Sequence, residues 1–103
     1  MPTSFNKGSL ATITVASAEG TGSGKTDVSL SGYTPASGEK YAYKIAASDA
    51  PAAWYGMVLD NTWTVATFPL DELASTEGYK ITVVSVDAFG QVVAAGNATI
   101  DVK

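Results

Sequence analysis

Apolar and polar residues alternate along most of this chain, in short segments separated by glycine, serine, asparagine and proline. The alternation is clear at residues 11–18, 26–31 and 40–47, and in the last of these it places Tyr41 and Tyr43 on the same face. Successive side chains of a strand point to opposite faces, so a period of two indicates a strand with one buried face. The pattern predicts a protein built from half-buried β-strands.

The last quarter of the chain carries the strongest strand signal. Residues 79–87 are rich in β-branched side chains, a tight turn that ends at Gly90 follows, and residues 91–102 return antiparallel. Glycine at this position of the turn is expected to adopt a positive φ. Gly96 and Asn97 interrupt the returning strand, and we expect a β-bulge there because a one-residue slip would turn every later side chain to the wrong face.

The middle of the chain is less regular. Residues 54–59 and 62–67 are predicted to form two short strands. Residues 69–75 have a proline early and acidic residues near the start, which favours one helical turn. Trp63 alternates with Val65, and this predicts that the tryptophan fills the core between two sheets.

Together these elements predict an all-β fold. About six to eight short strands with turn signals roughly every 8–12 residues, and no sustained 3.6-residue period, are typical of an immunoglobulin-like antiparallel β-sandwich of about seven strands. The 103 residues of the chain are the length of one domain, which we assign to residues 11–103. Residues 1–10 are predicted to be a flexible N-terminal arm, either a disordered terminus or a segment that adds to a neighbour's sheet edge.

The charge and the apolar runs of the chain limit the classes of partner that we expect. Six lysines, no arginine and ten carboxylates give a net charge of −4, which argues against nucleic-acid binding because such binding needs a basic surface. No apolar run reaches the roughly 20 residues of a membrane span, and the N-terminus lacks the apolar core of a signal peptide. We therefore expect no membrane partner, and either a protein used without secretion or a module of a longer chain.

Two residue types on which many catalytic sites depend are absent from the sequence. Without cysteine or histidine there is no catalytic triad, no thiol nucleophile and no nitrogen or sulfur ligand for a transition metal. Residues 19–26 (EGTGSGKT) approach a phosphate-binding loop, but a carboxylate replaces its first glycine and a strand pattern follows where a helix is required, which favours a flexible turn. The adjacent carboxylates Asp71 and Glu72 point in different directions. We expect no enzyme activity, no metal and no cofactor.

Aromatic side chains in the irregular regions are the remaining candidates for a binding site. Trp54 and Tyr55 lie in the irregular middle region, and Tyr33 lies in a loop. Exposed aromatic rings on a β-sandwich stack on sugar rings and anchor protein interfaces, whereas buried rings fill the core. Both alternatives stay open for Trp54, and the three residues together are the candidate binding site.

The C-terminal third of the chain resembles a known family. Residues 78–100 contain the hairpin G-x-x-I-x-V-V-x-V-D, a turn, and then V-V-x-A-G-x-A, and residues 15–20 and 41–45 fit the same layout. These features resemble the small immunoglobulin-like domains of tailed-bacteriophage virion proteins, which are often attached to major capsid, head-fibre or tail proteins. The family has no catalytic or ligand residues that could be carried over to this chain.

The resemblance implies a non-enzymatic decoration module on the capsid or tail surface of a virion. Its partner would be a phage capsid or tail protein, and weak adhesion to a host cell-surface glycan is a further expectation. The alternative is a carbohydrate- or cell-surface-binding β-sandwich module of a larger bacterial protein. Weak single contacts suffice for a module present in many copies, because multivalency raises the avidity.

Overall fold

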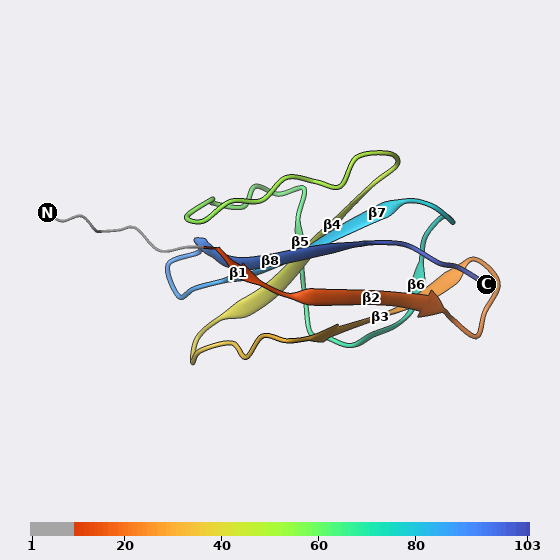
Figure 1. The fold of residues 1–103 in the computed structure, drawn as a ribbon, viewed down its shortest axis with the longest axis horizontal. Helices are drawn as coiled ribbons and strands as arrows, with labels where there is room; N and C mark the ends of the chain where they lie inside the picture. Colours follow the sequence, from red (N-terminus) through yellow and green to blue (C-terminus); the bar gives the residue numbers. More distant parts are fainter. Residues whose placement is uncertain (1–9) are drawn as a thin grey trace, which may run out of the picture.

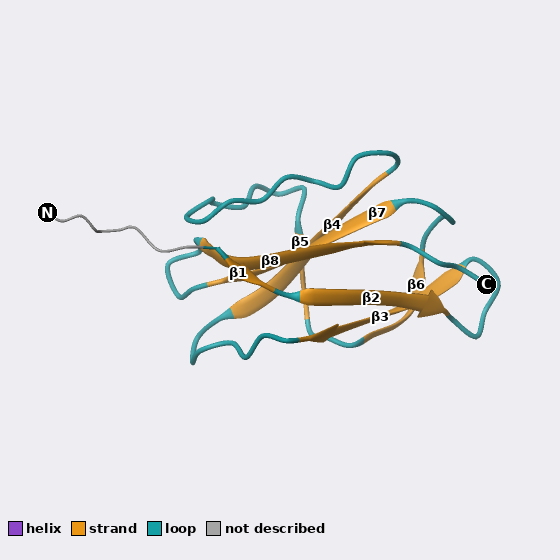
Figure 2. Cartoon of the chain, in the orientation of Figure 1, coloured by secondary structure: helices purple, strands orange, loops and turns teal. Residues whose placement is uncertain are grey.

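The computed structural model describes residues 10–103, which form two packed β-sheets (Figure 1 and Figure 2). The five-stranded sheet has the order β1-β8-β7-β4-β5, and the three-stranded sheet has the order β2-β3-β6. The predicted all-β immunoglobulin-like sandwich is therefore confirmed. No helix in this part of the chain is long and apolar enough to cross a membrane. The strands are β1 (Ala11–Thr12), β2 (Thr14–Glu19), β3 (Lys25–Ser31), β4 (Lys40–Ala46), β5 (Thr64–Ala66), β6 (Leu70–Ala74), β7 (Lys80–Val86) and β8 (Val92–Thr99).

The chain enters and leaves the sandwich at opposite ends. β1 is parallel to β8, and the other strand pairs of residues 10–103 are antiparallel. Because β1 is the first strand and β8 the last, this parallel pairing sends the two ends of the domain in opposite directions (Figure 1). We refer to the end that carries Leu10 and the β7–β8 turn as the amino pole. The end that carries the β2–β3 turn and Lys103 is the carboxyl pole.

One hydrophobic cluster lies between the two sheets. The alternating residues of β4 point into it, as predicted, and Tyr41 and Tyr43 are on the same face. Phe68 lies in the link from β5 to β6 and meets these two rings edge to face, with centroid distances of 5.6 and 6.3 Å. The fully buried members of the cluster are Val28, Ile81, Val83 and Ile100.

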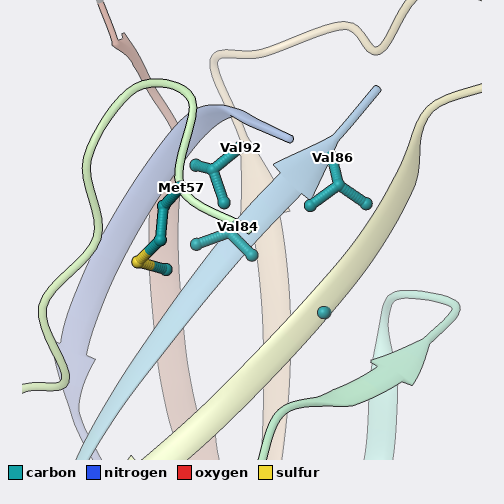
Figure 3. Packing of buried hydrophobic residues seen from close by; sticks show 5 residues of the cluster. Met57, Val84, Val86 and Val92 are labelled. Atoms are coloured by element: carbon teal, nitrogen blue, oxygen red, sulfur yellow. The ribbon is translucent and has the colours of Figure 1, made fainter. Parts of the chain in front are cut away.

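A second cluster covers the opposite, outer face of the five-stranded sheet. Residues 47–63, which connect β4 to β5, fold back over this face, and Met57 packs there beside Val84 and Val92 (Figure 3). Since neighbouring residues of β7 belong to different clusters, the strand is covered on both faces, and residues 81–86 are all buried. The buried members of this outer cluster are Ala42, Met57, Val84, Val86 and Val92.

The outer cluster explains two errors of the sequence predictions. Residues 54–59 are an irregular segment rather than a strand, and only Val58 forms an isolated bridge, with Gln91. Trp63 is half-buried and packs against the outer cluster rather than between the sheets, while Val65 is 63% exposed. The apolar side chains of the β4–β5 connection contact the outer face of the sheet, and the backbone of the connection does not pair as a strand to do so. The predicted strand at residues 62–67 is confirmed in part, as β5.

Residues 69–75 contain a strand instead of the predicted helical turn. β6 pairs with β3, and Leu70 and Leu73 both pack into the inter-sheet cluster although they are three residues apart. This is possible because the pairing shifts opposite Asp27, where Glu72 adopts a positive φ of 57°. Apolar residues three apart imitate a helical period, and here the irregularity of a bulge produces the same spacing.

A bulge is present in β8, but at Val93 rather than at the predicted position, Gly96 and Asn97. The β7–β8 pairing shifts after Val92, and this shift lets Val92 and Ala95 face the outer cluster together. The β7–β8 turn itself is confirmed, and its glycine, Gly90, has the expected positive φ of 83°.

Gly96 allows two segments of backbone to cross in close contact. At Ile13 the chain leaves β8 and passes to the other sheet, which divides the single strand predicted at residues 11–18 into β1 and β2. The amide of Ile13 donates to the carbonyl oxygen of Ala95 at 2.9 Å. A Cβ atom on Gly96 would lie 1.8 Å from the carbonyl oxygen of Ile13. Only glycine therefore fits beneath this crossing.

The predicted arm, residues 1–10, falls almost entirely outside the described residues. Only Leu10 is described, and it is half-buried against the outer cluster. Leu10 thus packs onto the domain that was assigned to residues 11–103.

We expect Gly96→Ala to destabilise the domain, because the added Cβ displaces the crossing backbone, at a cost of about 3 kcal/mol or more. Gly90→Ala is the control. A Cβ at Gly90 meets no atom within 4 Å, so that substitution costs only the strain of a positive φ, about 1–2 kcal/mol. Urea denaturation of both variants measures the difference. Equal losses would contradict the close approach at Gly96.

Candidate functional site

The three aromatic candidates from the sequence do not form one site. Trp54 and Tyr55 lie in the β4–β5 connection and are 59% and 44% exposed. Tyr33 lies in the β3–β4 connection and is half-buried. Within residues 10–103, no hydrogen bond or ring contact joins Tyr33 to either of the other two. Ligand binding by any of them stays a prediction.

Tyr33 belongs to a small polar cluster at the amino pole. Its hydroxyl donates to Oε1 of Glu39 at 2.6 Å, and the hydroxyl of the fully buried Ser85 donates to the same oxygen at 2.7 Å. Burial, together with the hydrogen bond and charge of Glu39, raises the pKa of Tyr33 to about 12. Burial also acts to raise the pKa of Glu39, but the hydrogen bonds from Tyr33 and Ser85 outweigh it and lower that pKa. The phenol of Tyr33 is therefore part of the internal structure.

A strip of exposed apolar side chains lies at the amino pole. It contains four of the five large apolar residues that are most exposed in residues 10–103. Two segments carry the strip and are joined by two hydrogen bonds of 2.8 Å, from the amide of Gly56 to Val92 and from the amide of Val92 to Met57. We refer to the following residues as the amino-pole strip: Trp54, Tyr55, Val58 and Phe89.

Two members of the strip were not among the sequence candidates. Phe89 is 88% exposed and lies in the β7–β8 turn, where Oδ1 of Asp87 accepts hydrogen bonds from the amides of Phe89 and Gln91 at 2.9 and 3.0 Å. An aromatic residue in a predicted tight turn cannot reach the core, and this signal was available in the sequence. Val58 is 70% exposed, but it lay in a predicted strand and gave no such signal. The exposed apolar side chains of the amino-pole strip can contact another apolar surface.

The glycine-rich turn between β2 and β3 is braced at the carboxyl pole. The amides of Thr21 and Gly22 donate to the carboxylate oxygens of Glu72, at 2.5 and 2.6 Å. These two backbone hydrogen bonds are the main cause of the lowered pKa of Glu72. A Cβ atom on Gly20 would lie 2.5 Å from Oε2 of Glu72. The predicted turn is present between β2 and β3, but its amides hold a carboxylate of the same chain, so it is braced where a flexible turn was expected.

Two cavities lie on the described part of the chain. One, of about 340 Å³, is lined by backbone, Thr82, Asn97 and small apolar side chains beside Leu10. A second, of about 290 Å³, is lined in part by Tyr41 and Phe68. In residues 10–103 no three acidic side chains come close enough to hold a metal ion.

The fold and surface define an immunoglobulin-like β-sandwich module, and two solved structures contain similar domains. Domains 7, 8 and 9 of the S-layer protein SbsC match with a TM-score of 0.70 and 29% identity, over 89% of this chain and 29% of that chain. Domains 4–9 of the surface layer protein SbsC match with a TM-score of 0.66 and 26% identity, over 90% of this chain and 14% of that chain. No protein-family model and no curated protein matches.

The chain spans less than a third of either structure. Shares of 29% of a three-domain chain and 14% of a six-domain chain each correspond to about one domain. Both structures are of a surface layer protein and neither is of a phage protein, so they favour the cell-surface alternative over the virion interpretation. The resemblance to phage domains stays a prediction.

Removal of the Tyr33 hydroxyl is expected to weaken the domain. Tyr33→Phe should lower the free energy of unfolding by about 1.5–3 kcal/mol, the range for hydrogen bonds to charged groups. Tyr55→Phe, at an exposed ring, is the control and should change it little. Urea denaturation at neutral pH compares the two variants.

The same bond predicts a loss of stability in alkali. The pKa of Tyr33 is about 12 in the folded protein against an ordinary value of 10.0, so its stabilisation is complete below pH 10 and is lost as the pH rises toward 12. Glu39 has a lowered pKa, and its stabilisation is lost as the pH falls below the ordinary value of 4.5. Tyr33→Phe should reduce the alkaline loss. If Tyr33→Phe and the unsubstituted protein lose the same stability between pH 10 and pH 12, the hydrogen bond from Tyr33 to Glu39 is contradicted.

The two tryptophans are expected to differ sharply. Trp54→Ala should change the free energy of unfolding by less than about 0.5 kcal/mol because the ring is exposed. Trp63→Ala should cost about 2 kcal/mol, less than the roughly 3–5 kcal/mol of a fully buried aromatic ring. The chain has two tryptophans, so each variant leaves one of them as the fluorophore. The emission of Trp63 in Trp54→Ala should be blue-shifted, and the emission of Trp54 in Trp63→Ala should resemble that of tryptophan in water. Equal losses of stability would contradict the packing of Trp63.

Proposed function

We propose that this chain is a non-enzymatic structural module of a multidomain surface-layer protein, joined in series to neighbouring domains. The observation that carries the proposal is the similarity of the whole domain to single domains of the surface layer protein SbsC, at 29% identity and a TM-score of 0.70. Its partners are then other domains of the same layer, and its location is the cell surface.

The direction of the chain supports a place in a series of domains. The parallel pairing of β1 with β8 puts Leu10 near one pole and Lys103 at the other (Figure 1). A domain with this geometry passes the chain through its long direction and adds its own length to the series. A domain with both ends at one pole would instead form a side branch.

The use of the polar side chains supports a structural role. The carboxylates of Glu39, Glu72 and Asp87 all accept hydrogen bonds from within the domain. They hold the two poles in shape, where a neighbouring domain would make contact. The amino-pole strip provides apolar surface at the pole from which a preceding domain would extend, and interdomain interfaces are built from such surfaces.

Immunogold labelling tests the location. With antibodies raised against the 103-residue chain, we expect dense label over the surface of intact cells of the source organism. Phage particles purified from the same culture are the comparison, and they should carry no label. Label on the particles would support the virion interpretation instead, and label that appears only after cells are made permeable would contradict both. Binding of the chain to purified cell-wall glycan, lost in Trp54→Ala, would identify it as a glycan-binding module.

A further inference from the structure

The first strand of the domain is held side by side with the last. β1 pairs with β8 in parallel, Ala11 with Ala94 and Thr12 with Ala95, and the amide of Ile13 adds a hydrogen bond to Ala95. If the two ends of the chain are pulled apart, β1 is drawn toward the amino pole and β8 toward the carboxyl pole. The force then acts along both strands, across the hydrogen bonds that join them.

The second strand is loaded in the same way. β2 forms six residue pairs with β3, from Thr14 with Ser31 to Glu19 with Thr26. β2 continues from β1, so the same pull draws it toward the amino pole. β3 begins at the carboxyl pole, where Lys25 is attached to the end of the chain. The antiparallel β2–β3 ladder is therefore also pulled along its strands.

The end of the chain is attached at the carboxyl pole by successive amides. Asp101 donates to the hydroxyl of Ser17 and Val102 donates to the carboxylate of Glu77, both at 2.9 Å. Lys103 donates to the carbonyl oxygen of Lys25 at 3.1 Å. The last three residues are thus each tied to another part of the domain, and force on Lys103 spreads to both sheets.

The glycine-rich turn connects this attachment to β6. The amide of Gly24 donates to the carbonyl oxygen of Lys103 at 2.9 Å, and its own carbonyl oxygen accepts from Ser75 at 3.2 Å. Glu72 holds the amides of Thr21 and Gly22 in the same turn. Through these contacts the carboxyl pole ties together β3, β6 and the end of the chain.

We propose that the domain is a load-bearing module that resists tension between its amino and carboxyl ends through the β1–β8 and β2–β3 ladders. The physical reason is the direction of the force. Strands pulled along their length must break all the hydrogen bonds of the ladder at once, two residue pairs and the Ile13 bond in β1–β8 and six residue pairs in β2–β3. Strands peeled apart from one end break them one after another. The inference rests on the proposed function, because only a domain joined to others at both ends carries tension.

Single-molecule force spectroscopy in two pulling directions tests the proposal. The chain contains no cysteine, so introduced cysteines provide the only attachment points. The first variant carries two added cysteines, one before Met1 and one after Lys103. Pulling between them loads the ladders along their strands. The second has Thr76→Cys and a cysteine after Lys103, both at the carboxyl pole, which peels β8 from β7 from the open end of their hairpin.

We expect the force of unfolding to be severalfold higher in the first direction than in the second. The two variants differ only in the position of one introduced cysteine, and urea denaturation of both checks that Thr76→Cys leaves the thermodynamic stability unchanged. Forced unfolding reports the rate of unfolding. Equal forces in the two directions would overturn the proposal. This outcome would leave the surface location intact, and the immunogold result would be unaffected by it.

A substitution at the carboxyl pole provides the second readout. Glu72→Gln keeps the shape of the side chain but leaves one amide of the turn without an acceptor, and it should lower the force for end-to-end pulling more than for peeling. Asp71→Asn is the matched control on the neighbouring exposed residue and should leave both forces unchanged. An equal effect of the two substitutions would overturn the part assigned to the glycine-rich turn.

Discussion

Strand β7 is covered on both of its faces and paired along both of its edges. One face packs against the three-stranded sheet, the other lies under residues 47–63, and β4 and β8 are its neighbours. Burial of apolar surface is the main favourable contribution to folding, and a strand of this kind needs both covers. The β4–β5 connection supplies the outer cover, and Met57 and Trp63 pack there.

The two poles show how the ends of the chain depend on this core. At one end, Gly96 lets the backbone at Ile13 cross against β8 before the chain passes to the other sheet. At the other end, Glu72 and Gly24 tie the glycine-rich turn to β6 and to Lys103. Both attachments involve glycine, for different reasons: a Cβ at Gly96 would occupy the space where the backbones meet, whereas Gly24 adopts a positive φ of 72° and a Cβ there would meet no atom within 4 Å. A domain fixed in this way at both ends suits a position in a series of linked domains.

Local patterns in the sequence predicted much of the fold. The period of two located β2, β3 and β4, and β-branched residues followed by a tight turn located β7 and β8. Glycine chemistry identified the positive φ of Gly90. Two predictions failed where apolar residues are three apart. Leu70 and Leu73 were assigned to a helical turn because a bulge and a helix place apolar residues at the same interval, and the bulge that brings Val92 and Ala95 to one face was expected at Gly96 and Asn97. The candidate site was predicted only in part: Trp54 and Tyr55 are exposed, Tyr33 is engaged with Glu39, and Phe89 and Val58 were missed.

The sequence by itself determined the fold class, the strand-rich ends of the chain and the lack of cysteine and histidine chemistry. These depend on residue type and on spacing between near neighbours, which a pattern contains directly. Only the tertiary structure decided that a loop covers the outer face of β7, that Glu72 holds a turn about fifty positions away in the chain, and that β1 lies parallel to β8. Such contacts depend on which surfaces remain uncovered once the sheets have packed, and no local pattern records that.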